Sequence, residues 1–297
     1  MANKIYRAFG RTVRSFVDLP ATEIEAGPID WDFVLEGESA PPSDGMHTED
    51  LAAGDDGFEA KGLARFTFAD NRILVRPAPG VQATDLISTL TGSLAALLLA
   101  RAGHYVLHGT TLRYRDRLVI LCGNAGAGKS TQASFLVRNG WDLIADDVSP
   151  ITWSGNRASV HRGFQSMRLF PDSLGLIGMD ADAYPKLYAG TTKCLVDFGP
   201  PRHFERDQTA SVAGVILLEE SDRFLLEKLP ERVGLISLLS LQHPTAAIVY
   251  DTTAERRAAA FRGGSQLAQN VPVVRVCRPK TRESLSETAH ALLKLVS

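Results

Sequence analysis

The sequence of 297 residues has room for one large domain or two modest ones. Apolar residues make up 44% and charged residues 22%, both close to globular averages, which excludes wholesale disorder and allows a buried core. The net charge of -2, without a basic run or stripe, argues against nucleic acid as the main partner. The cysteines Cys122, Cys194 and Cys277 form no close pair, which favours a reduced, cytoplasmic setting over a zinc or disulfide framework.

The first part of the chain predicts a small, β-rich lobe. Alternating apolar and polar residues at 64–68 and 72–76 predict two strands around an Asp70-Asn71 turn. Pro77, Pro79 and Gly80 then mark a boundary. We therefore expect a small N-terminal lobe over residues 1–83 and a second domain over residues 84–297.

An apolar helix is expected to open the second domain, over residues 84–101. Its most apolar stretch is short for a bilayer and is bracketed by Asp85 and Arg101, so we expect a buried helix and no membrane partner. Further on, strands are expected at 105–108, 110–114, 118–122, 142–148, 212–218 and 271–277, and helices at 129–139, 231–241, 254–269 and 282–296. This alternation predicts an α/β core with mixed strand directions.

Residues 123–130 satisfy the phosphate-loop pattern G-x-x-x-x-G-K-[ST], between an apolar strand and a helix, which is the context that the motif requires. Small residues let successive backbone N–H groups face phosphate oxygens, and the helix N-terminus adds partial positive charge. Lys129 should reach the β and γ phosphates, and the Ser130 hydroxyl should ligate Mg²⁺. We therefore predict binding of ATP, or a close relative, with Mg²⁺. The predicted nucleotide-binding residues are Gly123, Asn124, Ala125, Gly126, Ala127, Gly128, Lys129 and Ser130.

Two acids and a histidine lie on either side of this segment in the sequence. Asp146 and Asp147 end the strand expected at 142–148, which in a doubly wound sheet places them beside the phosphate loop. Strand alternation points their side chains to opposite sides, so one can face Mg²⁺ while the other faces a different partner. The alternative for each acid is a strand-terminal turn or a helix cap. His108 ends the strand before the hairpin that leads into the loop, where a lone histidine is more often structural than catalytic.

The combined pattern resembles the C-terminal catalytic domain of HPr kinase/phosphorylase. The matching segments are Leu107-His108-Gly109, then Gly123-x-x-Gly126-x-Gly128-Lys129-Ser130-Thr131, then Asn139-Gly140-Trp141-Asp142-Leu143-Ile144-Ala145-Asp146-Asp147-Val148. The resemblance implies a fold of the HPr kinase/phosphoenolpyruvate carboxykinase type and a protein-serine kinase that uses ATP and Mg²⁺. It implies that Asp147 accepts the proton of the serine hydroxyl, that Asp146 helps to place Mg²⁺, and that His108 orients or tunes the acid pair. It also adds Thr131 to the nucleotide-binding segment.

The sequence departs from this family in two places. The family has a Glu-x-Arg-Gly stretch that supplies a further metal ligand, whereas this sequence has Val160-His161-Arg162-Gly163 without a glutamate. The Pro-Val-Arg-Pro-Gly-Arg loop associated with phosphorolysis has no clear counterpart, which puts phosphorylase activity in doubt. Residues 163–172 and 6–10 resemble stand-alone HPr-kinase-like proteins of peptide-biosynthesis clusters, including kinases that modify the C-terminal serine of lasso-peptide precursors.

Arg162 and Arg168 are candidates for a cationic clamp on the γ-phosphate or the substrate, with surface pairing to nearby acids as the alternative. His161, His203 and His243 show no metal-ligand spacing and are expected to be structural or exposed.

The leading hypothesis is an Mg²⁺-ATP-dependent kinase that phosphorylates a serine hydroxyl of a peptide or small protein, such as a lasso-peptide precursor. A small-molecule kinase, acting for example on free serine, stays open. So does a nucleotide-binding regulator with weak catalysis, because the metal-ligand glutamate is missing. The family forms hexamers, but the N-terminal lobe looks different, so the hexamer is not carried over and a homo-oligomer stays open.

Overall fold

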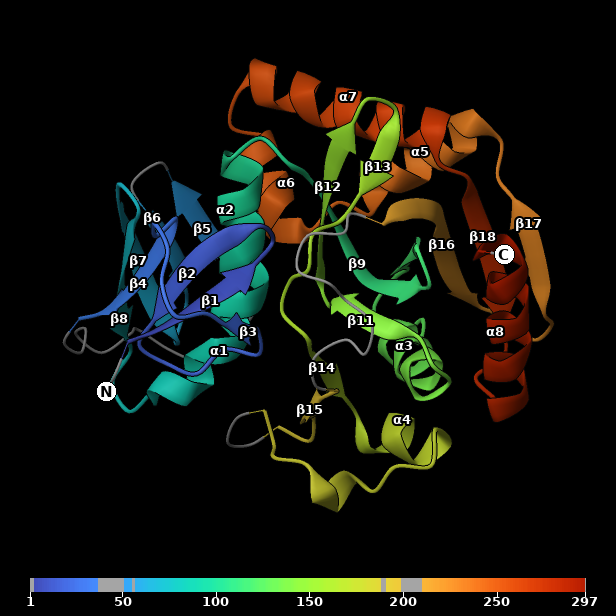
Figure 1. The fold of residues 1–297 in the computed structure, drawn as a ribbon, viewed down its shortest axis with the longest axis horizontal. Coiled ribbons are helices and arrows are strands. Elements are labelled where there is room, and N and C mark those ends of the chain that lie inside the picture. Colours follow the sequence, from blue (N-terminus) through green and yellow to red (C-terminus); the bar gives the residue numbers. More distant parts are fainter. Residues whose placement is uncertain (1–2, 37–50, 55–56, 188–190, 199–209, 297) are drawn as a thin grey trace.

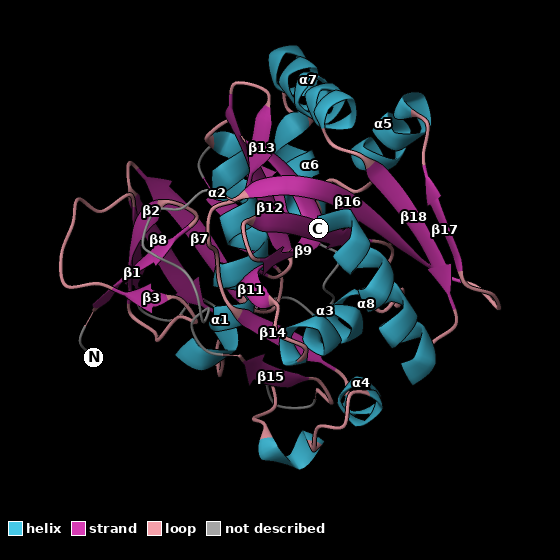
Figure 2. Ribbon diagram, turned by 45° about the vertical axis from the view of Figure 1, so that its right-hand side comes forward, coloured by secondary structure: helices cyan, strands magenta, loops and turns pink. Residues whose placement is uncertain are grey.

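The computed structural model describes residues 3–36, 51–54, 57–187, 191–198 and 210–296. Within these residues the strands form two eight-stranded sheets and one two-stranded sheet. In Figures 1 and 2 the first large sheet lies to one side of the molecule, and helices surround the second. The sequence prediction of a mixed α/β fold is therefore confirmed.

The first sheet is built from residues 4–77. Its spatial order is β3-β1-β2-β4-β8-β7-β6-β5. In β8 the buried Ile73 and Val75 alternate with the exposed Arg72 and Arg76, because only one face of the sheet covers the core. β7 and β8 confirm the two strands predicted around the Asp70-Asn71 turn. The strands are β1 (Lys4–Ala8), β2 (Arg11–Ser15), β3 (Thr22–Glu23), β4 (Trp31–Leu35), β5 (Leu51–Gly54), β6 (Gly57–Ala60), β7 (Ala64–Ala69) and β8 (Arg72–Pro77).

One hydrophobic core runs through both parts of the chain. It includes Phe66 from the first sheet, Leu90 from the helical segment that follows and Val215 from the second sheet. The first sheet ends before the predicted boundary at residue 83, yet it shares this core with the rest of the molecule. The division into a lobe over 1–83 and a domain over 84–297 therefore stays a prediction.

The helix predicted over residues 84–101 is confirmed, with an interruption. A 3₁₀ turn (Ala83–Leu86) and α1 (Ile87–Thr89) lead into a π-helical turn (Leu90–Leu94), and α2 (Ala95–Arg101) completes the segment. By length and composition Ala83–Arg101 could cross a membrane, but most of its apolar side chains are buried in the core. In Figures 1 and 2 α2 lies between the two large sheets, which is the place of a core helix.

The second sheet has the order β13-β12-β9-β10-β16-β18-β17, with β11 paired to β9 off this path. β10, β16 and β18 are parallel, while β9 and β17 are antiparallel to their neighbours, so the predicted mixture of strand directions is confirmed. The strands are β9 (Tyr105–Tyr114), β10 (Arg117–Cys122), β11 (Asp142–Ala145), β12 (Val148–Ser154), β13 (Arg157–Ser159), β16 (Ser211–Glu220), β17 (Leu225–Lys228) and β18 (Val273–Arg278).

β10 is apolar from Leu118 to Cys122, where both of its faces are covered. Ile120 and Cys122 belong to the core that the two large sheets share. Val119 and Leu121 point to a second core, beneath α3 (Lys129–Arg138) and α8 (Arg282–Val296). This is the burial that a wholly apolar strand predicts. The other face is covered by α5 (Glu231–Ser240), α6 (Pro244–Tyr250) and α7 (Ala254–Asn270).

The predicted helices at 129–139, 231–241, 254–269 and 282–296 are confirmed as α3, α5, α7 and α8. Short elements had no periodic signal and were not predicted. They include α4 (Pro171–Leu176), α6 and the two-stranded sheet of β14 (Ser166–Leu169) and β15 (Cys194–Asp197).

The strand predicted over 142–148 is wrong in one respect. β11 ends at Ala145, and β12 begins at Val148, so Asp146 and Asp147 lie in a bend between two strands. Both strands are antiparallel to β9. The acids therefore do not end a strand of a doubly wound sheet. A backbone φ of 69° at Asp147 breaks the extended chain at this point.

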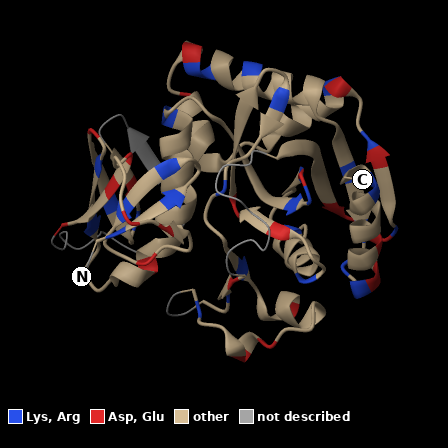
Figure 3. Cartoon of the chain, in the orientation of Figure 1, with Lys and Arg blue, Asp and Glu red and all other residues tan. Residues whose placement is uncertain are grey.

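Positive and negative residues are interspersed on the same elements in the described part of the chain, as Figure 3 shows. The expectation that nucleic acid is not the main partner stays a prediction.

Candidate functional site

The turn over residues 123–128, between β10 and α3, is called the phosphate-loop turn after the sequence pattern that it carries. β10 ends at Cys122, and α3 begins at Lys129, directly after its N-cap residue Gly128. Gly126 and Gly128 have φ of 82° and 84°, in the left-handed region that residues with a Cβ rarely adopt. The free N–H groups at the start of α3 therefore face this turn, where they favour an anion.

Lys129 is folded over the turn. Its Nζ donates a hydrogen bond to the carbonyl oxygen of Gly123 at 2.7 Å. Burial lowers the pKa of Lys129, while Cys122, Asp147 and Asp146 act on this pKa in the opposite direction. Gly109 pairs with Cys122 at the start of the turn, and its N–H donates to the carbonyl oxygen of Asp147 at 3.3 Å, so the backbone of the acid pair lies beside the turn. The structure brings Lys129 and the acid pair together.

The two hydroxyl residues after Lys129 have different surroundings. Ser130 is half-buried in the first turn of α3 and remains the candidate Mg²⁺ ligand of this turn. Thr131 is buried, and its Oγ1 donates a hydrogen bond to Oγ of Ser173 in α4 at 2.9 Å. The side chain of Thr131 thus ties α3 to α4, and only its backbone lies in the predicted nucleotide-binding segment.

The bend that holds the acid pair gives each carboxylate its own partners. Asp147 occupies the left-handed region, and strained backbone of this kind clusters at functional sites. Oδ1 of Asp146 accepts a hydrogen bond from the hydroxyl of Thr110 at 2.6 Å. Burial, and next the negative charge of Asp147, raise the pKa of Asp146 above its usual value. An ionised Asp146 is therefore costly unless a cation joins it.

Asp147 is the centre of a cluster of three basic side chains. Its Oδ1 lies 3.1 Å from Nδ1 of His108, and its Oδ2 accepts a hydrogen bond from Nη2 of Arg168 at 3.0 Å. Nε2 of His243 lies 3.8 Å from the same Oδ2. Burial opposes ionisation, but the charge of Arg168 and the two histidines outweigh it and hold the pKa of Asp147 well below its usual range. Asp147 is therefore a carboxylate at neutral pH.

His243 belongs to this cluster although the sequence did not single it out as functional. It is 4% exposed and is the N-cap residue of α6, where its Nδ1 accepts the Thr245 N–H at 3.3 Å. This contact assigns the proton of the neutral ring to Nε2, the nitrogen that faces Asp147. The His243-Pro244 step is a recognisable start of a helix. His243 comes close to Asp147 only because the chain folds, so the residues around His243 in the sequence give no sign of this contact.

The π-helical turn reaches the same cluster through Gly92. A Cβ added at Gly92 would lie 2.7 Å from Oδ2 of Asp147 and 3.0 Å from Nη2 of Arg168. The helix backbone therefore approaches the ion pair as closely as only glycine allows. π-turns inside helices are rare and are frequent at functional sites.

Arg162 does not join this cluster. Its Nη1 donates a hydrogen bond to Oγ1 of Thr22 in β3, and its backbone carbonyl accepts the N–H of Phe9. Burial, the largest influence, lowers the pKa of Arg162, while Asp142 raises it. The residue therefore joins the first sheet to the start of β11. Of the two arginines singled out from the sequence, the structure brings only Arg168 to the acid pair. His203 lies outside the described residues.

Two groups of side chains could be considered for a metal ion. Ligand atoms of His108, Asp147 and His243 lie within 4.8 Å of one another. However, Nε2 of His243 carries a proton, and Arg168 already pairs with Asp147, so this trio is a poor metal site. Mg²⁺ prefers oxygen ligands. Asp146 fits such an ion, because a divalent cation would relieve the repulsion between the two carboxylates.

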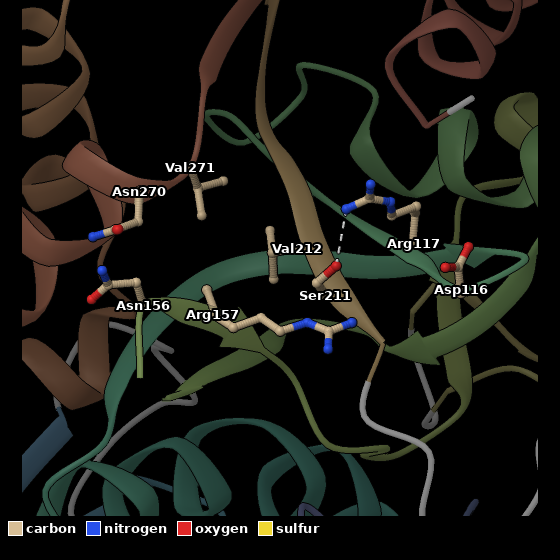
Figure 4. A pocket seen from close by; sticks show the side chains of 9 residues that line it. Asp116, Arg117, Asn156, Arg157, Ser211, Val212, Asn270 and Val271 are labelled. Atoms are coloured by element: carbon tan, nitrogen blue, oxygen red, sulfur yellow. Dashed lines mark hydrogen bonds between the residues drawn. The ribbon is translucent and has the colours of Figure 1, made fainter. Parts of the chain in front are cut away.

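A pocket of about 340 Å³ lies at the other end of β10, and Figure 4 shows the side chains that line it. Arg117, the first residue of β10, donates a hydrogen bond there to Oγ of Ser211 at 3.2 Å. The phosphate-loop turn follows the last residue of the same six-residue strand. At about 3.3 Å per residue the pocket and the turn are well separated. None of the site residues predicted from the sequence lines this pocket.

Comparisons with known proteins give little beyond this geometry. No family model matches the chain, and no curated protein matches it. A solved structure of the HPr(Ser) kinase/phosphatase from Coxiella burnetii is similar at a TM-score of 0.32 and 14% sequence identity. The similarity covers 65% of this chain and 99% of that one. At this TM-score the similarity carries no argument.

Proposed function

We propose that this chain is an Mg²⁺-ATP-dependent kinase that phosphorylates a serine hydroxyl of a peptide or small protein. The observation that carries the proposal is the placement of a phosphate-loop turn with its lysine beside a buried acid pair: Gly109 pairs with Cys122 at the start of the turn, and its N–H donates to the carbonyl oxygen of Asp147. Phosphoryl transfer requires little more of a protein than positioning, charge neutralisation and a residue that accepts a proton. The turn, Lys129 and Asp147 have these properties.

In the proposed step the oxygen of the acceptor hydroxyl attacks the γ-phosphorus, and the bond from that phosphorus to the β–γ bridging oxygen breaks. ADP leaves with the bond's electron pair, and the hydroxyl proton passes to the carboxylate of Asp147. The start of α3 and Lys129 bind the phosphate oxygens. Ser130 and Asp146 would hold Mg²⁺, which neutralises phosphate charge when it is bound.

Arg168 has two roles in this proposal. Its contact with Asp147 holds that side chain as a carboxylate, which is the form that can accept a proton. An ion-paired carboxylate is a weak base, so we propose that Arg168 turns from Asp147 to the γ-phosphate when the nucleotide is bound. Of the two arginines predicted to form a clamp, the geometry therefore supports Arg168 and not Arg162.

The choice of a peptide serine as acceptor rests only on the resemblance of the sequence to HPr-kinase-like proteins. A small-molecule kinase with the same phosphate chemistry is the alternative. A cytoplasmic location goes with the proposal, because all three cysteines are free thiols.

The direct test incubates the protein with γ-labelled ATP, Mg²⁺ and serine-containing peptides, in parallel with free serine. We expect the wild-type protein to transfer the label to a peptide. The Asp147→Asn variant should lose this transfer and still bind ATP. Label on free serine alone would favour the small-molecule kinase. ATP binding without transfer to any hydroxyl acceptor would favour a catalytically weak regulator, for which the Arg168–Asp147 pair is the specific observation.

A further inference from the structure

Arg278, the last residue of β18, is a buried cation that lies against the phosphate-loop turn. It is 2% exposed. β10, β16 and β18 are parallel, so their C-terminal ends share the sheet edge at which the turn begins. Nη2 of Arg278 lies 3.5 Å from the carbonyl oxygen of Gly128, the N-cap residue of α3.

The contacts of Arg278 do not compensate its charge. Nη1 donates to the carbonyl oxygen of Pro279 at 3.1 Å and to Oγ of Ser284 at 3.2 Å, while Nε has no hydrogen-bond partner among the described residues. Within the described part of the chain no carboxylate forms an ion pair with it, and burial lowers the pKa of Arg278 without an opposing acid. Burying a charge without a counter-charge is costly.

The position of Arg278 increases this cost. The N-terminus of α3 carries a partial positive charge, and Lys129 adds a second cation in the same turn. A third positive charge behind Gly128 is unfavourable unless an anion is bound at the turn. This observation is independent of the sequence pattern, because Arg278 lies far from the loop in sequence and is no part of the motif.

We infer that Arg278 is a positioning residue for the phosphate groups of the ligand, and that its charge acts through the Gly128 peptide at the start of α3. The inference rests on the proposed function and assigns to that site a cation outside the phosphate-loop motif. Since a Coulomb interaction scales with ligand charge, Arg278 strengthens binding of a triphosphate more than binding of a monophosphate. A purely structural role would not distinguish these ligands.

The test compares inorganic tripolyphosphate with inorganic phosphate, which removes any contribution of the nucleoside. Arg278→Met deletes the charge and keeps most of the side-chain volume. Arg275→Met is the matched control, because Arg275 lies on the same strand but pairs with Glu219 and Glu227. Titration calorimetry measures the affinities, and thermal unfolding is followed with and without tripolyphosphate.

We expect Arg278→Met to weaken tripolyphosphate binding about 10- to 100-fold, to weaken phosphate binding less, and to unfold no earlier than the wild type without ligand. Arg275→Met should change the affinity by less than about twofold. Wild-type affinity in a folded Arg278→Met would overturn the inference. So would an equal loss for both ligands together with earlier unfolding, which is the signature of a structural role.

If Arg278→Met does not fold, Arg278→Lys decides. Lysine keeps the charge but not the planar fork, so we expect tripolyphosphate binding within about threefold of that of the wild type. A loss of about tenfold or more in a folded Arg278→Lys would then overturn the inference, because the charge alone would not account for the binding. Absence of tripolyphosphate and ATP binding in the wild type would contradict the proposed function itself, which is a distinct outcome.

Discussion

Lys129 is the residue on which the proposed nucleotide binding depends most directly. Its Nζ lies on the phosphate-loop turn, 2.7 Å from the carbonyl oxygen of Gly123, and burial lowers its pKa. Lys129→Ala removes the only side-chain cation of the motif. We expect the affinity for a fluorescent ATP analogue to fall by about 10- to 100-fold, because a charge-assisted hydrogen bond is lost. Unchanged affinity and activity would exclude the turn as the phosphate site.

His243 is expected to act on catalysis through Asp147. His243→Asn keeps a side chain that caps the start of α6, since asparagine is a favoured N-cap residue, but it cannot reach Asp147. We expect a folded protein whose kcat falls by about tenfold while its KM for ATP is unchanged. A fall in unfolding temperature with unchanged kcat would show that His243 only caps the helix.

At the scale of elements, the π-helical turn sets the distance between the helix and the Arg168–Asp147 pair. Gly92→Ala places a methyl group against both side chains of this pair. We expect phosphoryl transfer to fall by about tenfold or more, with ATP affinity retained, because the displaced groups lie outside the phosphate-loop turn. Transfer rates and ATP titrations of the variant check this expectation.

The matched control for Gly92→Ala is Gly175→Ala in α4. Gly175 has open space where a Cβ would stand, and its φ is not positive. This variant should keep both activity and stability. Equal losses in the two variants would show that helix glycines matter in general and that the contact with Asp147 does not.

The sequence predicts those parts of the site that depend on neighbouring residues in the chain, and it does not predict those that depend on tertiary packing. The phosphate-loop pattern is local, so residues 123–130 predict a strand before the turn and a helix after it, and β10 and α3 confirm these two elements. The neighbours of Asp147 are not local, because His243 and Gly92 reach it only through the packing of α6 and the helical segment. Arg162 carries the charge that a phosphate clamp requires, but the fold directs it toward Thr22.

The fold shows the same contrast between local features, which the sequence predicts, and non-local ones, which it does not. Long periodic segments such as α7 and α8 were predicted nearly to the residue. The bend at Asp147 was missed, since the apolar run of β11 gives no sign that a non-glycine residue there adopts a positive φ. Most strands of the first sheet were also missed. β4 pairs with β2 and β8, which lie far from it along the chain, whereas β1 and β2 form a local hairpin whose Phe9-Gly10 turn was overlooked.

At the scale of the whole molecule, residues of the N-terminal part hold the segment that lies beside the acid pair. Phe9 of the β1–β2 turn packs edge-on against Phe164, with ring centroids 5.5 Å apart. The carbonyl oxygen of Phe164 accepts the backbone N–H of Asp146 at 3.3 Å. The N–H of Gln165 donates to the carbonyl oxygen of Pro20 at 2.8 Å. The segment beside the acid pair is therefore held by residues of the N-terminal part.

The stability of the first sheet should depend on pH through Asp32. This buried side chain pairs with Arg14, whose hydrogen bonds lower the pKa of Asp32. A lowered pKa contributes stability above the unfolded-state value of 3.8, and the contribution is lost as the pH falls through the lower folded-state pKa. Asp32→Asn should cost about 2 kcal/mol of unfolding free energy at pH 7.

Urea unfolding at a series of pH values measures this difference. It should shrink as the pH falls below 3.8. Asp70→Asn is the control, because Asp70 is exposed in the β7–β8 turn at a φ of 55°, a conformation that asparagine tolerates. Its cost should stay within about 0.5 kcal/mol. A constant difference for Asp32→Asn across the whole pH range would contradict the linkage.

The pairing of β9 with three strands decides which parts of the molecule can move. β9 pairs Gly109 with Cys122 before the phosphate-loop turn, His108 with Val148 after the acids, and Thr111 with Ala145 before them. The turn and the acid pair are thus fixed to a single strand and cannot separate by a hinge. Arg168 lies in a different sheet, with β15. In the proposed reaction we therefore expect opening and closing around the acceptor to be a motion of the β14–β15 side, with slow exchange in solution confined to it.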